Sequence, residues 1–205
     1  MGTVYAVTSG KGGVGKSTVS VGLSLAFTKL GVFADIEAKH YELATNLFEA
    51  DVNSMLNFPH NLVLKKTYGG IKISTAKEKI QSLEEFEFVI GKIEFKGIGT
   101  IETEIVEPGD VIYGEGSLFM CLSKVSTNAI WRTRRLGDVF SKLGSGSKKL
   151  NDYFTDKKVD VDVRDKIPLL VVQNQVLVVA GLDVSENVKI DGNTDQIVKI
   201  TFHSK

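Results

Sequence analysis

The sequence predicts an α+β protein with an N-terminal strand–P-loop–helix fragment, an antiparallel strand-rich middle module and a small mixed α/β C-terminal module. A glycine-rich loop opens the chain, short strands separated by glycine turns follow, and brief helices alternate with strands towards the end. The 205 residues are 42% hydrophobic and 24% charged, which is typical of a globular protein that folds in water. We expect domains at residues 1–34, 35–122 and 123–205.

The first fragment begins with an apolar strand at residues 4–7. Residues 9–15 form a glycine loop, and residues 16–30 have apolar side chains at helical spacing, which predicts half of a βαβ unit. A second helix is expected at residues 35–50. Its apolar face would contain Ile36, Leu43, Leu47 and Phe48.

The middle of the chain predicts an antiparallel meander with one wet, acidic side. In the segment at residues 99–106, Ile101 and Ile105 together with Glu102 and Glu104 give an imperfect apolar–acidic alternation, and Thr103 is compatible with the buried face. The expected strands cover residues 62–68, 70–74, 86–90, 92–97, 99–106 and 111–114. The apolar neighbours of Cys121 indicate a buried strand thiol.

The C-terminal part predicts a loop at residues 137–146 and helices at residues 148–155 and 162–166. Strands are expected at residues 129–134, 169–172, 175–182 and 196–203. Trp131 is expected in the core. His40, His60 and His203 have no Asp or Cys at ligand spacing, so we assign no metal site to them.

Charge is unevenly distributed along a chain of zero net charge. Residues 82–120 contain nine acidic and two basic residues (−7), whereas residues 124–166 contain eleven basic and six acidic residues (+5). Such a basic block is either an anion-binding surface or a solvated face.

The glycine loop satisfies the P-loop pattern G-x-x-x-x-G-K-[ST], between a strand and a helix as the motif requires. Its backbone N–H groups would wrap phosphates, Lys16 would neutralise them, and Ser17 would bind Mg²⁺ if ATP binds. The expected nucleotide-binding residues are Gly10, Lys11, Gly12, Gly13, Val14, Gly15, Lys16, Ser17 and Thr18.

The longer string AVTSGKGGVGKST is similar to the deviant Walker loop of Min and Par ATPases over residues 1–31. The resemblance implies that Lys11 reaches a partner's nucleotide across a dimer. No aspartate-terminated second strand, switch region or Walker B strand follows, so we do not expect ATP hydrolysis.

The segments WRTRRLGD, KKLNDYF and RDKIPLL, together with a strand leading to VAG, resemble the C-terminal domain of tRNA(Ile)-lysidine synthetases. The resemblance extends back to about residue 35. It departs from the family at Leu136 and Asp160, where the family often has proline; both are expected loop positions.

That resemblance implies a role in tRNA processing. The family is an ATP-dependent ligase that adenylates the wobble cytidine of isoleucine tRNA and joins lysine to it through a carbon–nitrogen bond. Its S-G-G-x-D-S motif does not occur in this sequence, so we expect a tRNA recognition module that is inactive alone and that a separate catalytic subunit could complete.

Six basic residues are the candidates for contact with tRNA phosphates: Arg132, Arg134, Arg135, Lys148, Lys149 and Arg164. The alternative is internal pairing, particularly of Arg134 and Arg164 with Asp138 or Asp165. Tyr153 and Phe154 could stack on a base or pack their helix against the sheet.

Two functions therefore remain open. One is tRNA recognition, and the other is ATP binding by a Min/Par-type protein whose tail is regulatory; the third alternative is an inactive remnant that folds and does neither. Both fit the cytoplasm, because no segment is apolar enough for a signal peptide or a membrane span. The oligomeric state is left open.

Overall fold

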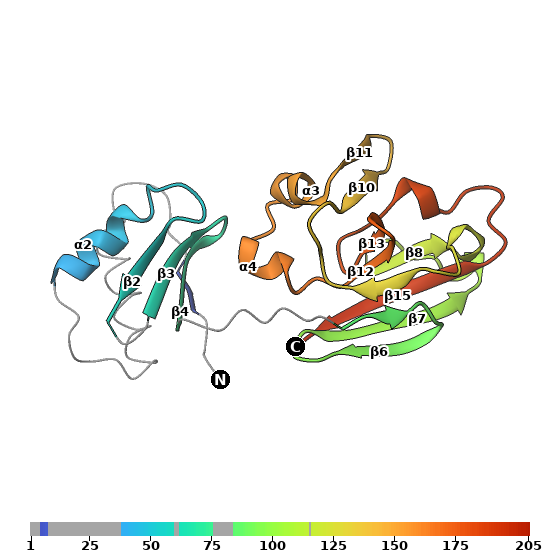
Figure 1. The fold of residues 1–205 in the computed structure, drawn as a ribbon, viewed down its shortest axis with the longest axis horizontal. Coiled ribbons are helices and arrows are strands. Elements are labelled where there is room, and N and C mark those ends of the chain that lie inside the picture. Colours follow the sequence, from blue (N-terminus) through green and yellow to red (C-terminus); the bar gives the residue numbers. More distant parts are fainter. Residues whose placement is uncertain (1–4, 8–37, 60–61, 76–83, 115) are drawn as a thin grey trace. The chain divides into compact units, whose positions relative to one another are not determined.

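A computed structural model of the chain describes residues 5–7, 38–59, 62–75, 84–114 and 116–205 (Figure 1). The chain forms two compact units, Met1–Lys79 and Ile80–Lys205. The domain boundaries expected from the sequence, after residues 34 and 122, stay a prediction. The P-loop residues Gly10 to Thr18 and the helix expected at residues 16–30 lie outside the described residues.

The first unit contains a four-stranded antiparallel sheet and one helix, α2 (Ala38–Asn46). The sheet order is β1 (Tyr5–Val7), β4 (Gly70–Thr75), β3 (Leu62–Thr67) and β2 (Met55–Phe58). A strand was predicted where β1 lies. Within the described residues, however, β1 pairs antiparallel to β4 and does not form the parallel pair of a βαβ unit.

Leucine and isoleucine side chains of β3 and β4 form the core of this unit against α2. Ala44 and Leu47 point into it because residues three apart lie on the same helix face. Leu43, predicted on the buried face, is 45% exposed, although it lies one helical turn before the buried Leu47.

The second unit has two packed sheets. The first is antiparallel, with the order β6 (Gly91–Phe95), β7 (Gly99–Val106), β15 (Ile197–Ser204) and β8 (Ser117–Cys121). The predicted antiparallel pairing of β6 with β7 is confirmed. The predicted meander is wrong, because the strand latest in sequence lies between β7 and β8.

Of the residue-level predictions for this sheet, some are confirmed and others are wrong. Thr103 and Cys121 are buried, as predicted, but Ile105 is 50% exposed near the end of β7. No strand forms at residues 111–114, which follow the 3₁₀ turn η1 (Pro108–Asp110). Two further 3₁₀ turns are η2 (Leu122–Lys124) and η3 (Glu186–Val188).

The second sheet has seven strands, in the order β11, β10, β13, β12, β9, β5, with β14 paired to β13. Only β10 and β13 are parallel among its described pairs. The strands are β5 (Phe86–Glu87), β9 (Ile130–Arg132), β10 (Val139–Lys142), β11 (Gly146–Lys149), β12 (Leu169–Val172), β13 (Gln175–Val179) and β14 (Asp183–Val184). Residues 137–146, predicted as a loop, instead form most of the β10–β11 hairpin.

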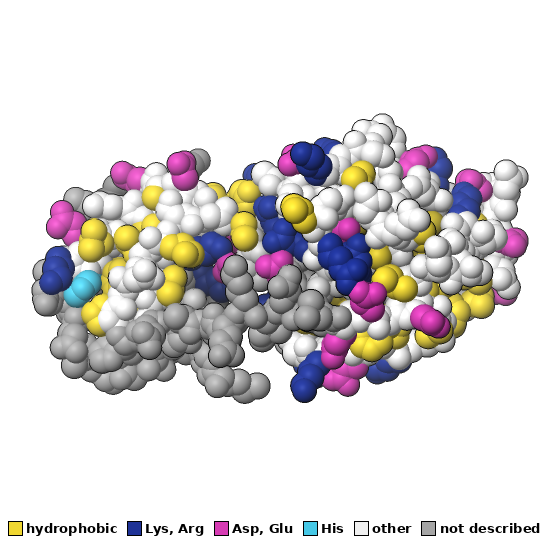
Figure 2. Space-filling view, viewed as in Figure 1, with side chains coloured by type: hydrophobic (Ala, Val, Ile, Leu, Met, Phe, Trp, Pro, Cys, Tyr) yellow, Lys and Arg dark blue, Asp and Glu magenta, His cyan; other side chains and the backbone are white. Residues whose placement is uncertain are grey.

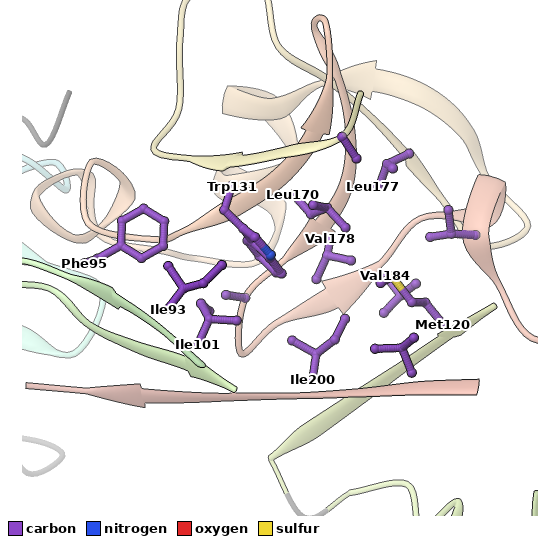
Figure 3. Close-up of a cluster of buried hydrophobic side chains, with 14 of the residues drawn as sticks. Ile93, Phe95, Ile101, Met120, Trp131, Leu170, Leu177, Val178, Val184 and Ile200 are labelled. Atoms are coloured by element: carbon purple, nitrogen blue, oxygen red, sulfur yellow. The ribbon is translucent and has the colours of Figure 1, made fainter. Parts of the chain in front are cut away.

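Side chains along the strands of the seven-stranded sheet point alternately to its two faces, and each face packs in a different hydrophobic core. Trp131, Leu170 and Val178 point towards the antiparallel sheet and pack there with Ile101 and Ile200 (Figure 3). The opposite face packs on α3 (Leu150–Asp156) and neighbouring residues, and α4 (Val161–Arg164) follows. The sheet thus separates the two helices from the antiparallel sheet. In the part of the chain that the structure describes, no helix has the length and apolarity to cross a membrane.

Candidate nucleic-acid interface

A buried ion pair closes the turn that follows β9. The Nη1 and Nη2 atoms of Arg132 donate to the two carboxylate oxygens of Asp138 at 2.9 and 2.7 Å. Asp138 also accepts the backbone N–H of Arg135 at 2.7 Å. The side chains of the pair are 3% and 1% exposed. Residues 132–138 are therefore a loop whose two ends are joined by charge-assisted hydrogen bonds.

The remaining terminal donors of Arg132 bind backbone oxygens. Nη1 donates to the carbonyl of Thr133 at 2.9 Å, and Nη2 donates to that of Gln173 at 3.0 Å. Gln173 lies in the turn between β12 and β13 with a φ of 57°. Arg132 therefore fastens the loop to this turn. The Arg132 side chain, expected to contact RNA, is 3% exposed, and its terminal nitrogens are bonded within the protein.

Arg164 has a similar position at the end of α4. It is 7% exposed, and its Nε donates to the carbonyl of Val159 at 3.0 Å. Its guanidinium lies 5.8 Å from the ring centroid of Phe154 and donates weakly to α3, to the carbonyl of Asn151 and the hydroxyl of Thr155. Internal bonding, one of the two alternatives for Arg164, is what the structure has, but with oxygens other than those of Asp138 and Asp165.

Arg134 connects three segments at the surface. Its Nε donates to Oδ1 of Asp165 at 2.7 Å, and its Nη1 donates to Oδ1 of Asn151 at 2.5 Å. Asn151 is in the first turn of α3, and Asp165 directly follows α4. The guanidinium of Arg134 therefore joins the loop 132–138 to the start of α3 and the end of α4. The Arg134 side chain is 23% exposed.

The other three predicted residues face solvent. Arg135 is about half exposed and forms an ion pair with Glu85. Lys148 donates to Asp156 at 2.6 Å, and this hydrogen bond is the main cause that lowers the pKa of Asp156. Lys149, the last residue of β11, is exposed, and its side chain has no hydrogen bond or ion pair with the described part of the chain.

Two further lysines, which the sequence motifs did not single out, and Leu136 belong to this surface. Lys158 and Lys166 follow α3 and α4, are exposed and are likewise unpaired among the described residues. Leu136 is 99% exposed at the tip of the loop. Both lysines were counted in the basic block, which was the only sequence signal for them. Lys and Arg side chains, with some Asp and Glu, lie around the ends of α3 and α4 in Figure 2.

The aromatic residues of α3 are core residues. Tyr153 is 1% exposed, Phe154 is 0% exposed, and the Tyr153 ring packs 4.6 Å from that of Phe140. Of the two alternatives for this pair, packing against the sheet is the one observed. Trp131 is fully buried, as predicted. In the described residues, no group of three or more His, Cys, Asp or Glu side chains is arranged to hold a metal ion.

Two family models match the chain. The model of the TilS substrate C-terminal domain matches residues 129–200, which contain the loop, α3 and α4. A ParA model, described as NUBPL iron-transfer P-loop NTPase, matches residues 1–37.

Curated relatives named tRNA(Ile)-lysidine synthase match most of the chain. The protein of Caldanaerobacter subterraneus subsp. tengcongensis is 30% identical over 173 residues, and that of Clostridioides difficile is 31% identical over 176 residues. Each alignment covers 82% of this chain but only 37% and 38% of the relative. The chain thus spans less than two fifths of the length of these relatives.

A solved structure has the same fold as much of the chain. The crystal structure of a TilS C-terminal domain matches with a TM-score of 0.51 and 22% identity, covering 59% of this chain and 96% of that domain. The family model and the relatives agree: the greater part of this chain is similar to the C-terminal region of tRNA(Ile)-lysidine synthases, and it is preceded by a segment similar to P-loop NTPases of the ParA type.

Proposed function

We propose that the second unit is a tRNA recognition module that positions isoleucine tRNA for a domain that modifies its wobble cytidine. The observation that carries this proposal is the junction at Arg134. It holds the loop 132–138 against the ends of two helices and so gathers the outward-facing cations Arg135, Lys149 and Lys166 near one another.

Double-stranded RNA is recognised mainly through its phosphates, its 2′-hydroxyl groups and its shape. A surface suited to it needs cations held in fixed places, with few of them neutralised by the protein itself. The buried bonds of Arg132 and Arg164 supply the rigidity, and the unpaired lysines supply the charge. The six residues predicted for tRNA binding thus divide into a positioning group and a contact group. The contact group consists of Lys149, which is unpaired among the described residues, and of Arg135 and Lys148, whose exposed ion pairs with Glu85 and Asp156 would have to open for RNA to bind.

The opposite side of the unit is less suited to a polyanion. Glu94, Glu102 and Glu104 lie on the outer face of the antiparallel sheet, where Lys199 pairs with Glu104 and Lys205 pairs with Glu94. We therefore place the RNA on the side of α3 and α4. The remaining modification chemistry would come from a catalytic domain like that of the relatives, in the cytoplasm where tRNA is found.

The experiment that tests this function is binding of a tRNA transcript to the purified chain at several salt concentrations. Each phosphate contact contributes about 0.7 to 0.9 to the slope of log affinity against log salt. We expect a steep loss of affinity with salt, and a shallower slope for Lys148→Ala/Lys149→Ala. Lys92→Ala, which removes an exposed lysine of β6, is the matched control and should leave the slope unchanged. A flat salt response of the unchanged chain would rule the proposal out.

ATP binding is the second candidate function, and the match of residues 1–37 to a P-loop model favours it. The residues that would bind the phosphates are Gly10 to Thr18, with Ser17 on Mg²⁺. Titration of a fluorescent ATP analogue with and without Mg²⁺ tests it. Affinity for the analogue should be lost in Lys16→Ala and kept in Lys149→Ala, whereas equal binding by both variants would contradict a P-loop site.

A further inference from the structure

Lys158 adopts a backbone conformation that lysine seldom adopts. Its φ is 54°, in the left-handed region, directly beyond the end of α3. The N–H of Lys158 donates to the carbonyl of Thr155 at 3.0 Å, and the N–H of Val159 donates to that of Phe154 at 2.9 Å. These two bonds define a Schellman motif, whose left-handed position is usually glycine and sometimes asparagine.

The side chain of Lys158 does not offset the cost of that backbone conformation with a stabilising interaction. It is exposed, and it has no hydrogen bond or ion pair with the described residues. Its neighbour Lys157 behaves differently, because its Nζ lies 3.1 Å from a carboxylate oxygen of Asp183 and 5.8 Å from the ring centroid of Tyr153. One of two adjacent lysines therefore supports the fold, while the other projects a free charge.

Residues held in sparsely populated backbone conformations are concentrated at functional sites. The nearest residues of α3 do not neutralise Lys158, since Asp156 is already bound by Lys148 at 2.6 Å. Lys149 precedes α3 and Lys158 follows it, so unpaired cations stand at both ends of this helix. Nine residue steps separate the two lysines, which corresponds to roughly 13 Å at a helical rise of about 1.5 Å per residue.

We propose that Lys158 is an additional RNA-binding residue, which contacts a backbone phosphate while Lys149 contacts another at the opposite end of α3. This inference rests on the function proposed above. It explains why the left-handed position after α3 holds a lysine and not the more stable glycine: the positive charge of the lysine faces the nucleic acid.

Three neutral replacements separate charge from backbone strain. Lys158→Gly and Lys158→Asn suit the left-handed conformation, whereas Lys158→Ala does not. We expect the first two to raise the melting temperature and the third to leave it nearly unchanged. All three should weaken binding of a tRNA transcript equally, and Lys158→Arg should preserve it.

The salt dependence gives the size of the effect. With one phosphate contact fewer, affinity should fall about 3-fold less between 50 and 200 mM salt than it does for the unchanged chain. A stabilised Lys158→Gly variant that binds tRNA like the unchanged chain would overturn the inference for Lys158 and leave the proposed function standing. Absence of salt-dependent binding in the unchanged chain would instead refute the proposed function itself. Lys92→Ala is again the control for loss of an exposed positive charge.

Discussion

The guanidinium of Arg132 and the carboxylate of Asp138 face each other in parallel, with both side chains at 3% exposure or less. The pair joins the end of β9 to the start of β10 and closes the loop that carries Arg134, Arg135 and Leu136. The arginine-rich loop 132–138, which in sequence looks like a run of exposed cations, is therefore held together by a buried ion pair of its own.

Removal of one partner of this pair should be costly. Asp138→Ala leaves a buried guanidinium without its counter-ion and the N–H of Arg135 without its acceptor, so we expect a loss of about 3–5 kcal/mol in the free energy of unfolding. Urea denaturation measures it. Asp156→Ala removes a solvent-exposed partner of Lys148 and should leave the denaturation midpoint nearly unchanged. Equal midpoints for the two variants would mean that the buried pair does not brace the fold.

Arg134 offers a test of positioning as distinct from charge. Arg134→Lys keeps the positive charge but cannot bridge Asn151 and Asp165 with the same planar fork. We expect tRNA affinity to fall several-fold while the salt slope stays the same, because the contacts are displaced and not deleted. A reduced slope would instead show that Arg134 itself neutralises a phosphate.

Gly99 is required where β7 meets β15. Its φ is 156°, and a Cβ atom there would lie 2.3 Å from the backbone oxygen of His203. Gly99→Ala should therefore cost about 2–4 kcal/mol of stability, because the clash is with backbone that cannot swing aside. Gly192→Ala meets no atom within 4 Å and is the control in thermal unfolding. A Gly99→Ala protein as stable as this control would show that the strand pairing can shift at that end.

Tyr153 should make stability depend on alkaline pH. Its burial, followed by the negative charge of Asp183 and the hydrogen bond to it, raises the pKa of the Tyr153 hydroxyl above its ordinary value of about 10. The neutral form is favoured in the folded state, so this contribution is complete below about pH 10 and is lost as the pH rises further. Unfolding in urea between pH 8 and 11 should show a steeper decline than in Tyr153→Phe. Parallel declines would contradict the raised pKa.

Local pattern was sufficient for several elements. The sequence predicted residues 99–106 as a strand, and β7 has those bounds, because turn glycines flank a stretch of β-branched residues alternating with glutamate. It missed the β10–β11 hairpin, since glycine and serine are as typical of loops as of tight hairpins. The position of β15 between two earlier strands depends on a pairing more than 80 residues apart in sequence, which no local pattern reveals.

The site was only partly accessible from sequence for the same reason. The resemblance identified the segment that contains the surface, but not which cations face outward. Arg132 is enclosed by a carboxylate six residues away and by a carbonyl 41 residues away, and the second of these is a contact that only the fold creates. Lys158 matched no motif, and its significance comes from a backbone angle.

The central place of β15 also governs how this unit can form during translation. Until Ile197–Ser204 have left the ribosome, β7 and β8 each keep an unpaired edge, and the apolar residues that face Ile200 stay open to water. Completion of the sheet must wait for the arrival of that strand, so nascent chains carry a template for aggregation until then.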